Sequence, residues 1–518
     1  MIAFLQRFGA FVQGILHGFD RLRFRGSLRQ LCYQLGAASY LGYSRILLKD
    51  YQTFAKATTA ALCQFIEKDA EAAGLYKYLN SSKISKEETA LQMAAAHKQT
   101  EGRIAVLGCV EPCRVLQVRK NKETGLLEPR SEDGKCLHYY HYYLDPQYGL
   151  RYTRLQSWFP FTMHIGFNGR DWLAQQMTAA GLGYEKHDNC FTWVEDWQAA
   201  QQLLDEQLET DWPSLLNGWA EESHPWLPQL LPHPIPRYWT AQEAEYTTDI
   251  AFATAEDLQR IYPRFVHHAC ALMSGTDVLR YMGYRVRKDG RPRLDMVGEV
   301  TTFIKQLLEG TCVHHRYRRN LLKMYDKAWQ ILRLENLLLD LGDFKVFRRK
   351  EGVRDGPQEN LGLRKGVADM HRRAEVGRKI NERYAEALST VEEKTSLEEL
   401  TKDLGERTEW KGRKARALNP LNEEDARLLE AVNRGEFAIN GLRNRDLRKL
   451  LFGEEATKEE TRRQSAKVTR MLRMLRAHGV IRKVPKTHRY QITTKGRTQL
   501  MALLAARQAN IEALTKAA

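Results

Sequence analysis

The sequence lacks any apolar run of membrane-spanning length that is free of charged residues. Residues 1–18 are fairly apolar, but they include Gln6, Arg7 and Gln13. They also lack the basic start and the small-residue cleavage site of a signal peptide. We therefore expect a cytoplasmic protein that is neither exported nor embedded in a membrane.

Closely spaced cysteine pairs are scarce as well. The eight cysteines are scattered, and only Cys109 and Cys113 lie near each other in the sequence. No second close pair completes the spacing of a structural zinc site. The pattern predicts reduced, mostly buried thiols.

Acidic residues are outnumbered, since 64 Asp and Glu face 80 Lys and Arg, a formal net charge of +16. A surplus of this size favours polyanionic partners, although a basic surface also serves solubility alone. The 518 residues, 43% hydrophobic and 10% aromatic, are enough for several well-packed domains. Nucleic acid is therefore the first partner class to consider.

We predict an α+β, multidomain protein with mixed or antiparallel sheets and packed helices in two central blocks. The expected segments are an N-terminal strand and helical region (1–100), a first α/β block (101–210), an extended Pro/Trp-rich connector (211–244), a second α/β block (245–350), a charged helical linker (351–420) and a C-terminal domain (421–518). A short similarity links residues 19–29 with 248–260, each with an aspartate in a strand ahead of a helix, and an internal repeat and chance both explain it.

The C-terminal domain has the element order of a winged helix-turn-helix. Two short helical segments precede a longer one at 461–477, which Gly479 ends, and two strands flank a basic turn at 482–489. Polar side chains of the long helix suit base edges in a major groove, and those of the turn suit phosphates. The helix residues are Gln464, Ser465, Lys467, Arg470 and Arg473, and the turn residues are Arg482, Lys483, Lys486 and Arg489.

This module resembles winged-helix regulators of the MarR type, a resemblance confined to the last seventh of the chain. It implies DNA binding, with structured RNA as the alternative nucleic acid. The competing interpretation is a basic helical domain that only caps the protein or holds a homodimer together.

The segment 311–335 carries the most concentrated polar pattern. If 323–327 is a strand, Lys323, Tyr325 and Lys327 lie on one face. Arg333 and Glu335 share a face of the next strand. Pairing of the two strands would gather these side chains on a surface that is costly to bury without a ligand, metal or nucleic acid.

The sequence Lys-Met-Tyr-Asp-Lys at 323–327, followed by Leu-Arg-Leu-Glu at 332–335, resembles the strand pair of rolling-circle replication initiators. The resemblance covers about 25 residues and implies a tyrosine nucleophile, Tyr325 or Tyr317, with Lys327 on the same face. It also implies a divalent metal, Mg²⁺ or Mn²⁺, with Glu335 as a ligand or base. The adjacent His314 and His315 depart from the alternating His pattern of those enzymes.

Further candidate metal ligands are Asp20, Glu111, Asp249 and His138, chosen as hard oxygen donors or imidazole near predicted strands. The competing interpretation of Asp20, which the neighbouring charges favour, is pairing with Arg21, Arg23 or Arg25. On a strand, His138 shares a face with Tyr140 and Tyr142, which suits either stacking of unpaired bases or aromatic core packing. A second basic concentration consists of Arg316, Arg318, Arg319 and Lys323.

The whole chain resembles an uncharacterised bacterial family associated with mobile elements and carrying a MarR-type domain. The residues that carry the resemblance are Gly18–Arg21, Glu111–Cys113, Gly134–Tyr140, Phe167–Gly169 and Lys323–Lys327. Two functions stay open. One is a metal-dependent DNA nickase or strand transferase of replication-initiator or transposase type. The other is a non-catalytic regulator or the protein component of a ribonucleoprotein.

Overall fold

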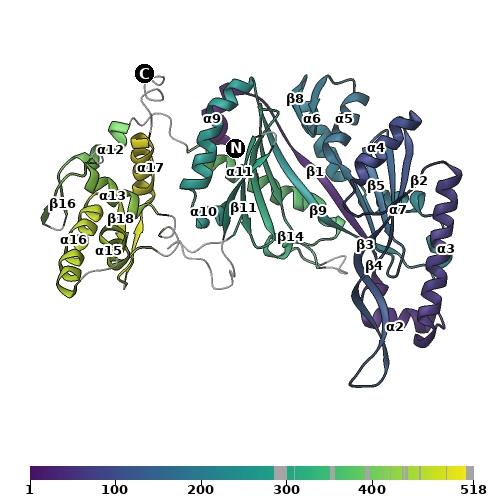
Figure 1. The fold of residues 1–518 in the computed structure, drawn as a ribbon. Helices are drawn as coiled ribbons and strands as arrows, with labels where there is room; N and C mark the ends of the chain where they lie inside the picture. Colours follow the sequence, from purple (N-terminus) through teal and green to yellow (C-terminus); the bar gives the residue numbers. More distant parts are fainter. Residues whose placement is uncertain are drawn as a thin grey trace. The chain divides into compact units, whose positions relative to one another are not determined.

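The computed structural model describes residues 1–284, 300–307, 310–350, 356–390, 397–410, 412–419, 422–434, 437, 441–453, 457–485 and 487–508. The chain divides into two compact units, Met1–Ser389 and Thr390–Ala518. Each is mixed α/β (Figure 1). No helix among the described residues is both long and apolar enough to cross a membrane.

One mixed sheet organises the first unit, with the strand order β10-β11-β12-β13-β9-β1-β6-β5-β4-β3-β2. All neighbours are antiparallel except β2 and β3, which run parallel. The strands are β1 (Val12–Leu28), β2 (Tyr76–Leu79), β3 (Gly102–Lys120), β4 (Leu127–Asp145), β5 (Gly149–Gln156), β6 (Met163–Asn168), β9 (Arg237–Phe252), β10 (Thr301–Leu307), β11 (Gly310–Tyr317), β12 (Asn320–Lys327) and β13 (Ile331–Leu337). The segments 1–100, 101–210 and 245–350 therefore contribute to one sheet and are not separate blocks.

The two halves of this sheet have the same connectivity. In the first half β1 is followed by helices and the edge strand β2, which has no counterpart among the described residues of the second half, and then by the meander β3-β4-β5-β6, whose last strand pairs with β1. In the second half β9 is followed by α9 (Ala255–His267) and α10 (Gly275–Tyr281), and then by β10-β11-β12-β13, whose last strand pairs with β9. Because β1 and β9 pair at the centre, the similar segments around Asp20 and Asp249 lie on neighbouring strands. This topology agrees with an internal repeat.

Helices α2 (Gln34–Tyr43), α3 (Tyr51–Ala72) and α7 (Trp212–Ser223) bury the apolar face of the first half. Phe24 of β1 packs against Trp212 and Phe167, with ring centroids 5.1 Å from Trp212. Aromatic side chains on alternate strand positions thus meet a helix that is apolar on one side, and the burial of each ring stabilises the fold.

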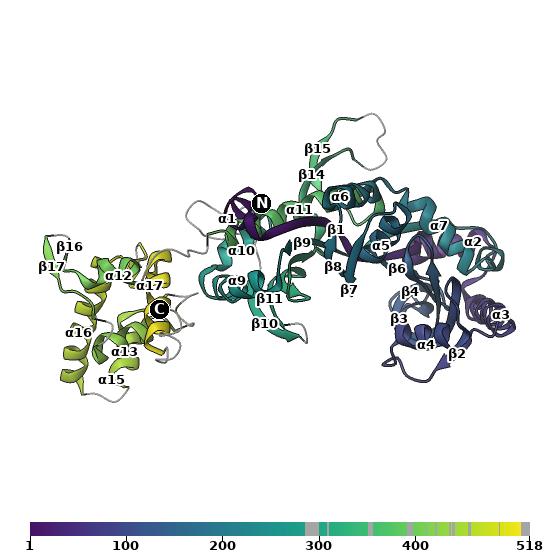
Figure 2. The same ribbon diagram turned by 90° about the horizontal axis from the view of Figure 1, so that it is seen from above.

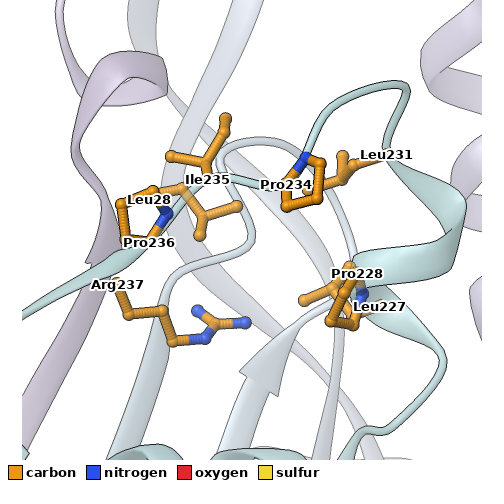
Figure 3. A pocket seen from close by; sticks show the side chains of 8 residues that line it. All are labelled: Leu28, Leu227, Pro228, Leu231, Pro234, Ile235, Pro236 and Arg237. Atoms are coloured by element: carbon orange, nitrogen blue, oxygen red, sulfur yellow. The ribbon is translucent and has the colours of Figure 1, made fainter.

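The segment 211–244 was expected to be an extended connector, and this prediction was wrong in part. Trp212 and Trp219 lie in α7, where Pro213 occupies the first turn and needs no backbone donor. A short helix, α8 (Leu227–Leu230), follows, and only the stretch up to β9 is irregular. There Pro234, Ile235 and Pro236 line an apolar pocket with Leu227 and Leu231 (Figure 3).

The charged segment 351–420 was expected to be a solvated linker, but α11 (Met370–Leu388) packs on the sheet. Its buried side Ile380, Tyr384 and Leu388 repeats every four residues, a helical stripe that the surrounding charges obscure. The Asn381 amide donates to the backbone carbonyl of Leu334 at 3.0 Å. This helix covers the face opposite the site described below.

The remaining elements of the first unit surround these layers. They are α1 (Ile2–Phe8), α4 (Lys86–His97), α5 (Gly169–Ala179), α6 (Trp197–Glu206), the hairpin of β7 (Tyr184–His187) and β8 (Cys190–Val194), and the hairpin of β14 (Lys345–Arg348) and β15 (Glu359–Gly362). Figure 2 shows α6 beside β1, where its Trp197 and Leu204 lie over Gly14 and Gly18. A side chain at either glycine would collide with α6, so the helix sits close to the strand.

The second unit contains the expected succession of helices and strands. These are α13 (Glu423–Val432), α15 (Asn444–Phe452), α16 (Lys458–Ala477), the hairpin of β18 (Ile481–Lys483) and β19 (Tyr490–Ile492), and α17 (Thr494–Gln508). Leu442 adds a bridge to Tyr490. Ahead of them lie α12 (Leu397–Gly405) and a small hairpin of β16 (Thr408–Trp410) and β17 (Arg413–Ala415). One apolar core joins the helices and the β18–β19 hairpin.

Candidate functional site

A β-bulge in β1 begins the site. Phe19 pairs with Tyr246 and Leu22 with Ala244, so Asp20 and Arg21 together oppose the single residue Glu245. Two consecutive residues at a bulge are turned toward the same side of a sheet. Arg21 accordingly donates to the Glu245 carboxylate at 2.8 Å.

The strands β12 and β13 supply the other side of the site. Lys323 lies opposite Glu335, and Tyr325 lies opposite Arg333, so the expected pairing of these two strands is present. Lys323 donates to Glu335, and its ammonium is also 3.8 Å from Glu245. The Tyr325 hydroxyl donates to the other Glu335 oxygen at 2.5 Å.

Asp20, Glu245 and Glu335 form an acidic triad in which one ligand oxygen of each lies within 4.8 Å of the other two. All three residues are buried, with exposed fractions of 2%, 7% and 2%. Among the described residues, none donates to Asp20 Oδ1. A buried carboxylate oxygen without a donor costs free energy, and a bound cation would offset that cost.

Arg333 holds the triad to the centre of the sheet. Its fully buried guanidinium donates to Asp20 at 2.9 Å and to both oxygens of Asp249 at 2.6 and 2.8 Å. Arg170 reaches Asp249 at 3.1 Å, and the Asn189 amide donates to Asp20 at 2.6 Å. Strands from both halves of the sheet thus meet in one buried ionic network.

Burial and neighbouring charges together shift the pKa values of the three carboxyl groups. Burial raises the pKa of Asp20, although Arg333 and Arg170 oppose the shift. Burial also raises the pKa of Glu245, assisted by the charge of Glu335. For Glu335 burial is outweighed by Lys323, so its pKa is lowered and the carboxylate stays ionised.

Tyr325 stays protonated in this environment. Burial, followed by the charge of Glu335, raises its pKa well above the usual value of tyrosine. The phenol is therefore a hydrogen-bond donor at rest, and Glu335 is the adjacent group that can accept its proton. Tyr325 could act as a nucleophile once Glu335 has taken its proton. That transfer requires a substrate or cation that changes the local charge.

The triad fits a hard divalent cation. Three carboxylates supply the oxygen ligands that Mg²⁺ and Mn²⁺ prefer, and the unpartnered Asp20 oxygen is available to one of them. Lys323 already neutralises part of the charge, so a cation would displace its ammonium from Glu335 or bind beside it.

Several predicted site residues lie elsewhere. Tyr317 is 1% exposed and packs against Tyr284, on the face opposite Tyr325. Lys327 shares the face of Tyr325 but donates to Asp188 at 2.7 Å. Asp249 is near the triad, yet both its oxygens are engaged by Arg333.

Glu111 and His138 lie on the far strands of the first half. Glu111 of β3 accepts from Tyr140 at 2.7 Å and from Arg154 at 2.8 Å, and it pairs with Lys86. His138 of β4 lies beside cysteines. Neither belongs to the acidic triad, because β1, β6 and β5 separate their strands from β9.

The basic concentration around 316–319 occupies the turn between β11 and β12. Arg316 and Arg319 are exposed, and Arg318 pairs with Asp343 at 3.1 Å. Lys323 is not part of this surface, since it lies within the site described above. Two of the four residues therefore present charge to solvent.

A row of polar side chains on the same face as the triad was not expected from the sequence. Arg23 follows Arg21 on β1 and pairs with Glu243 of β9. Farther along, Arg154 reaches His164 at 3.0 Å, and Tyr140 and Tyr152 approach each other with centroids 6.4 Å apart. The signal lies in the alternation of each strand, but only the strand order shows that these residues share a face.

In the second unit, two residues of α16 that were predicted to contact nucleic acid contact neighbouring helices. Ser465 donates to Asn444 of α15 at 3.0 Å, and Lys467 pairs with Glu424 of α13 at 2.6 Å. Arg470 and Arg473 are exposed, as expected, and so is Arg462.

The other residues predicted to contact nucleic acid also include both exposed and half-buried side chains. Gln464 is half-buried, while Arg482 and Lys483 of β18 are exposed. Arg489 is half-buried, and Lys486 lies outside the described residues. The exposed residues Arg462, Ala466, Arg470 and Arg473 recur at intervals of three or four residues and mark the free side of α16.

Comparisons of the chain with protein-family models, with curated proteins and with solved structures find no match.

Proposed function

We propose that this protein binds nucleic acid, with the second unit acting as a winged-helix domain of the MarR type. The observation that carries the proposal is the free side of α16, where Arg462, Arg470 and Arg473 are exposed together. The basic hairpin with Arg482 and Lys483 follows directly after this helix. A helix of this kind suits a major groove, and the hairpin suits the adjacent phosphates.

The test is a binding titration of the full chain against duplex DNA and structured RNA at several salt concentrations. The double variant R470Q/R473Q is expected to bind more weakly, and its salt dependence is expected to fall by about one unit of slope for each lost phosphate contact. The control R427Q changes an exposed arginine of α13. Equal losses in both proteins would assign the binding to net charge and refute the proposed surface.

A second function, divalent-cation-dependent phosphodiester chemistry, is favoured by the acidic triad beside Tyr325. In this proposal Asp20, Glu245 and Glu335 would hold the cation, which would stabilise the charge that develops on a phosphate. The Tyr325 oxygen would bond to phosphorus as the bond between phosphorus and the leaving oxygen breaks. Glu335 would take the phenolic proton, and the leaving oxygen would take a proton from water. Arg21 and Arg23 of the same face hold neighbouring phosphates.

This chemistry is tested with single-stranded and supercoiled DNA in the presence of Mg²⁺ or Mn²⁺. The wild type is expected to cleave and to form a covalent protein–DNA adduct, which Y325F removes and E335Q reduces strongly. E243Q is the matched control, because Glu243 lies two residues from Glu245 on the same strand and outside the triad. Binding without cleavage, together with RNA that co-purifies with the protein, would favour the non-catalytic regulator or ribonucleoprotein component.

Both functions are consistent with the role that the whole-chain resemblance implies, a protein of a bacterial mobile element. In that role the second unit selects the site and the first unit handles the strand. A homodimer would place two such domains on one duplex.

A further inference from the structure

Cys113, Cys136 and His138 form a second cluster on the first half of the sheet. One ligand atom of each residue lies within 4.8 Å of the other two. Cys113 is on β3 opposite Gly134, and Cys136 and His138 follow on the same face of β4. The strand pairing therefore brings together residues that the sequence separates.

The distance between the two sulfurs discriminates between two states of this pair. The Sγ atoms of Cys113 and Cys136 are 3.4 Å apart. A disulfide requires about 2.0 Å. Two thiolates on one tetrahedral zinc, each about 2.3 Å from the metal, are about 3.8 Å apart. The observed separation is closer to the metal-bound geometry.

His138 is oriented as a metal ligand would be. Its ring is fully buried, and Nδ1 lies 3.1 Å from the backbone carbonyl of Cys136. Among the described residues, none hydrogen-bonds to Nε2. A histidine that ligates a metal through one nitrogen usually donates the other N–H to a carbonyl or carboxylate. The carbonyl of Cys136 fixes this tautomer and leaves Nε2 as the ligand.

The position of the cluster indicates a structural role for a bound metal ion. β5 pairs with β4 only from His138 onward, and β2 pairs with β3 only from Tyr76 to Leu79 opposite Val106–Cys109. Beyond that point β3 and β4 continue as a two-stranded ribbon, visible in Figure 1 as a long hairpin. A two-stranded ribbon is only marginally stable by itself, so a cross-link at its base would add to the stability that contacts with α2 and α3 provide.

We propose that Cys113, Cys136 and His138 bind a zinc ion at the base of the β3–β4 ribbon. Cys and His ligands select zinc over magnesium, which separates this site from the acidic triad. No fourth Cys, His, Asp or Glu of the described residues joins the cluster, so water or an external ligand completes the tetrahedron. The site does not depend on the proposed nucleic-acid function.

The experiment measures metal content and thiol state in the full chain. Protein purified under reducing conditions is dialysed against a weak chelator and analysed by elemental mass spectrometry. One zinc ion per chain is expected for the wild type and for C32S, whereas C113S and H138Q fall to background. Cys32 is a half-buried cysteine of the same unit, outside the cluster, and controls for the loss of a thiol.

Cobalt replacement keeps the test informative if a variant does not fold. Co²⁺ added to metal-free wild type is expected to give thiolate charge-transfer absorption and the visible bands of tetrahedral cobalt. Three results overturn the proposal: no thiolate band, equal zinc in wild type and C113S, or a Cys113–Cys136 disulfide in protein kept reduced.

Discussion

The centre of the large sheet, where β1, β9 and β13 meet, buries ion pairs, whereas β4 in the outer part of the half that begins with β1 buries neutral rings. At the centre the fully buried Arg333 joins Asp20 to Asp249. On β4, His141 faces His224, with ring centroids 4.4 Å apart. One sheet thus contains two kinds of interior, because strand pairing places residues but does not specify their chemistry.

The difference suggests that these two regions of the sheet respond to different perturbations. Ion pairs in an apolar surrounding are sensitive to the loss of one partner. Buried imidazoles are sensitive to acid, because folding holds them neutral. Three substitutions test this contrast, in order of decreasing effect.

Replacing Arg333 by methionine is expected to have the largest effect. It leaves the buried carboxylates of Asp20 and Asp249 without their main partner, at a cost of about 3–5 kcal/mol in the free energy of unfolding. Urea denaturation of the full chain measures this value. R378M is the control, because the side chain of Arg378 on α11 is 48% exposed and its i,i+4 pair with Glu382 is worth less than about 1 kcal/mol. Similar costs for both would remove the distinction between buried and surface pairs.

Replacing Asn381 on α11 by alanine is expected to have the second largest effect. The Asn381 amide bridges the Leu334 carbonyl and Asn336, both in the second half, so N381A leaves buried polar groups without partners. The expected cost is about 2–3 kcal/mol, measured by the same denaturation. Q176A on α5, the helix that follows the first half, is the comparison. Gln176 makes one exposed hydrogen bond, so its loss should shift the midpoint very little.

His141 tests the acid response of the first half. Burial is the main cause that lowers its pKa to about 3, from 6.5 in the unfolded chain. Its stabilising contribution is therefore complete above pH 6.5 and is lost as the pH falls toward 3. Between pH 7 and 5.5 this loss is about 1.3 kcal/mol.

H141F is expected to reduce the difference in unfolding free energy between the two pH values by that amount. The control H97F alters an exposed histidine on α4. An unchanged pH dependence in H141F would show that other buried histidines, such as His17, govern the acid response.

Local patterns predicted the parts of this molecule that depend on neighbouring residues. The pairing of Lys323 with Glu335 follows from two strands joined by a short turn. The alternation of His138, Tyr139 and Tyr140 between two faces follows from the period of a strand. The order of helices and strands in the second unit follows from apolar spacing and from Gly479.

Features that depend on distant pairing were not predictable. Glu245 was not recognised as a site residue, because its position opposite Asp20 requires a bulge between strands more than two hundred residues apart. Cys136 was missed for a similar reason, since a diagonal neighbour on an adjacent strand leaves no characteristic sequence spacing. α11 was misjudged because its charged residues mask the stripe with Ile380 and Tyr384.

The central pairing of β1 with β9 also affects how either half of the sheet would behave if it were made alone. Within the described sheet this pair is where the two halves join, along strands of 17 and 16 residues. Either half made alone would expose that strand as an unpaired edge, a template for self-association. In the full chain, β1 covers the edge of β9 and β9 covers the edge of β1. A chain that contains both halves therefore avoids the aggregation expected of either half alone.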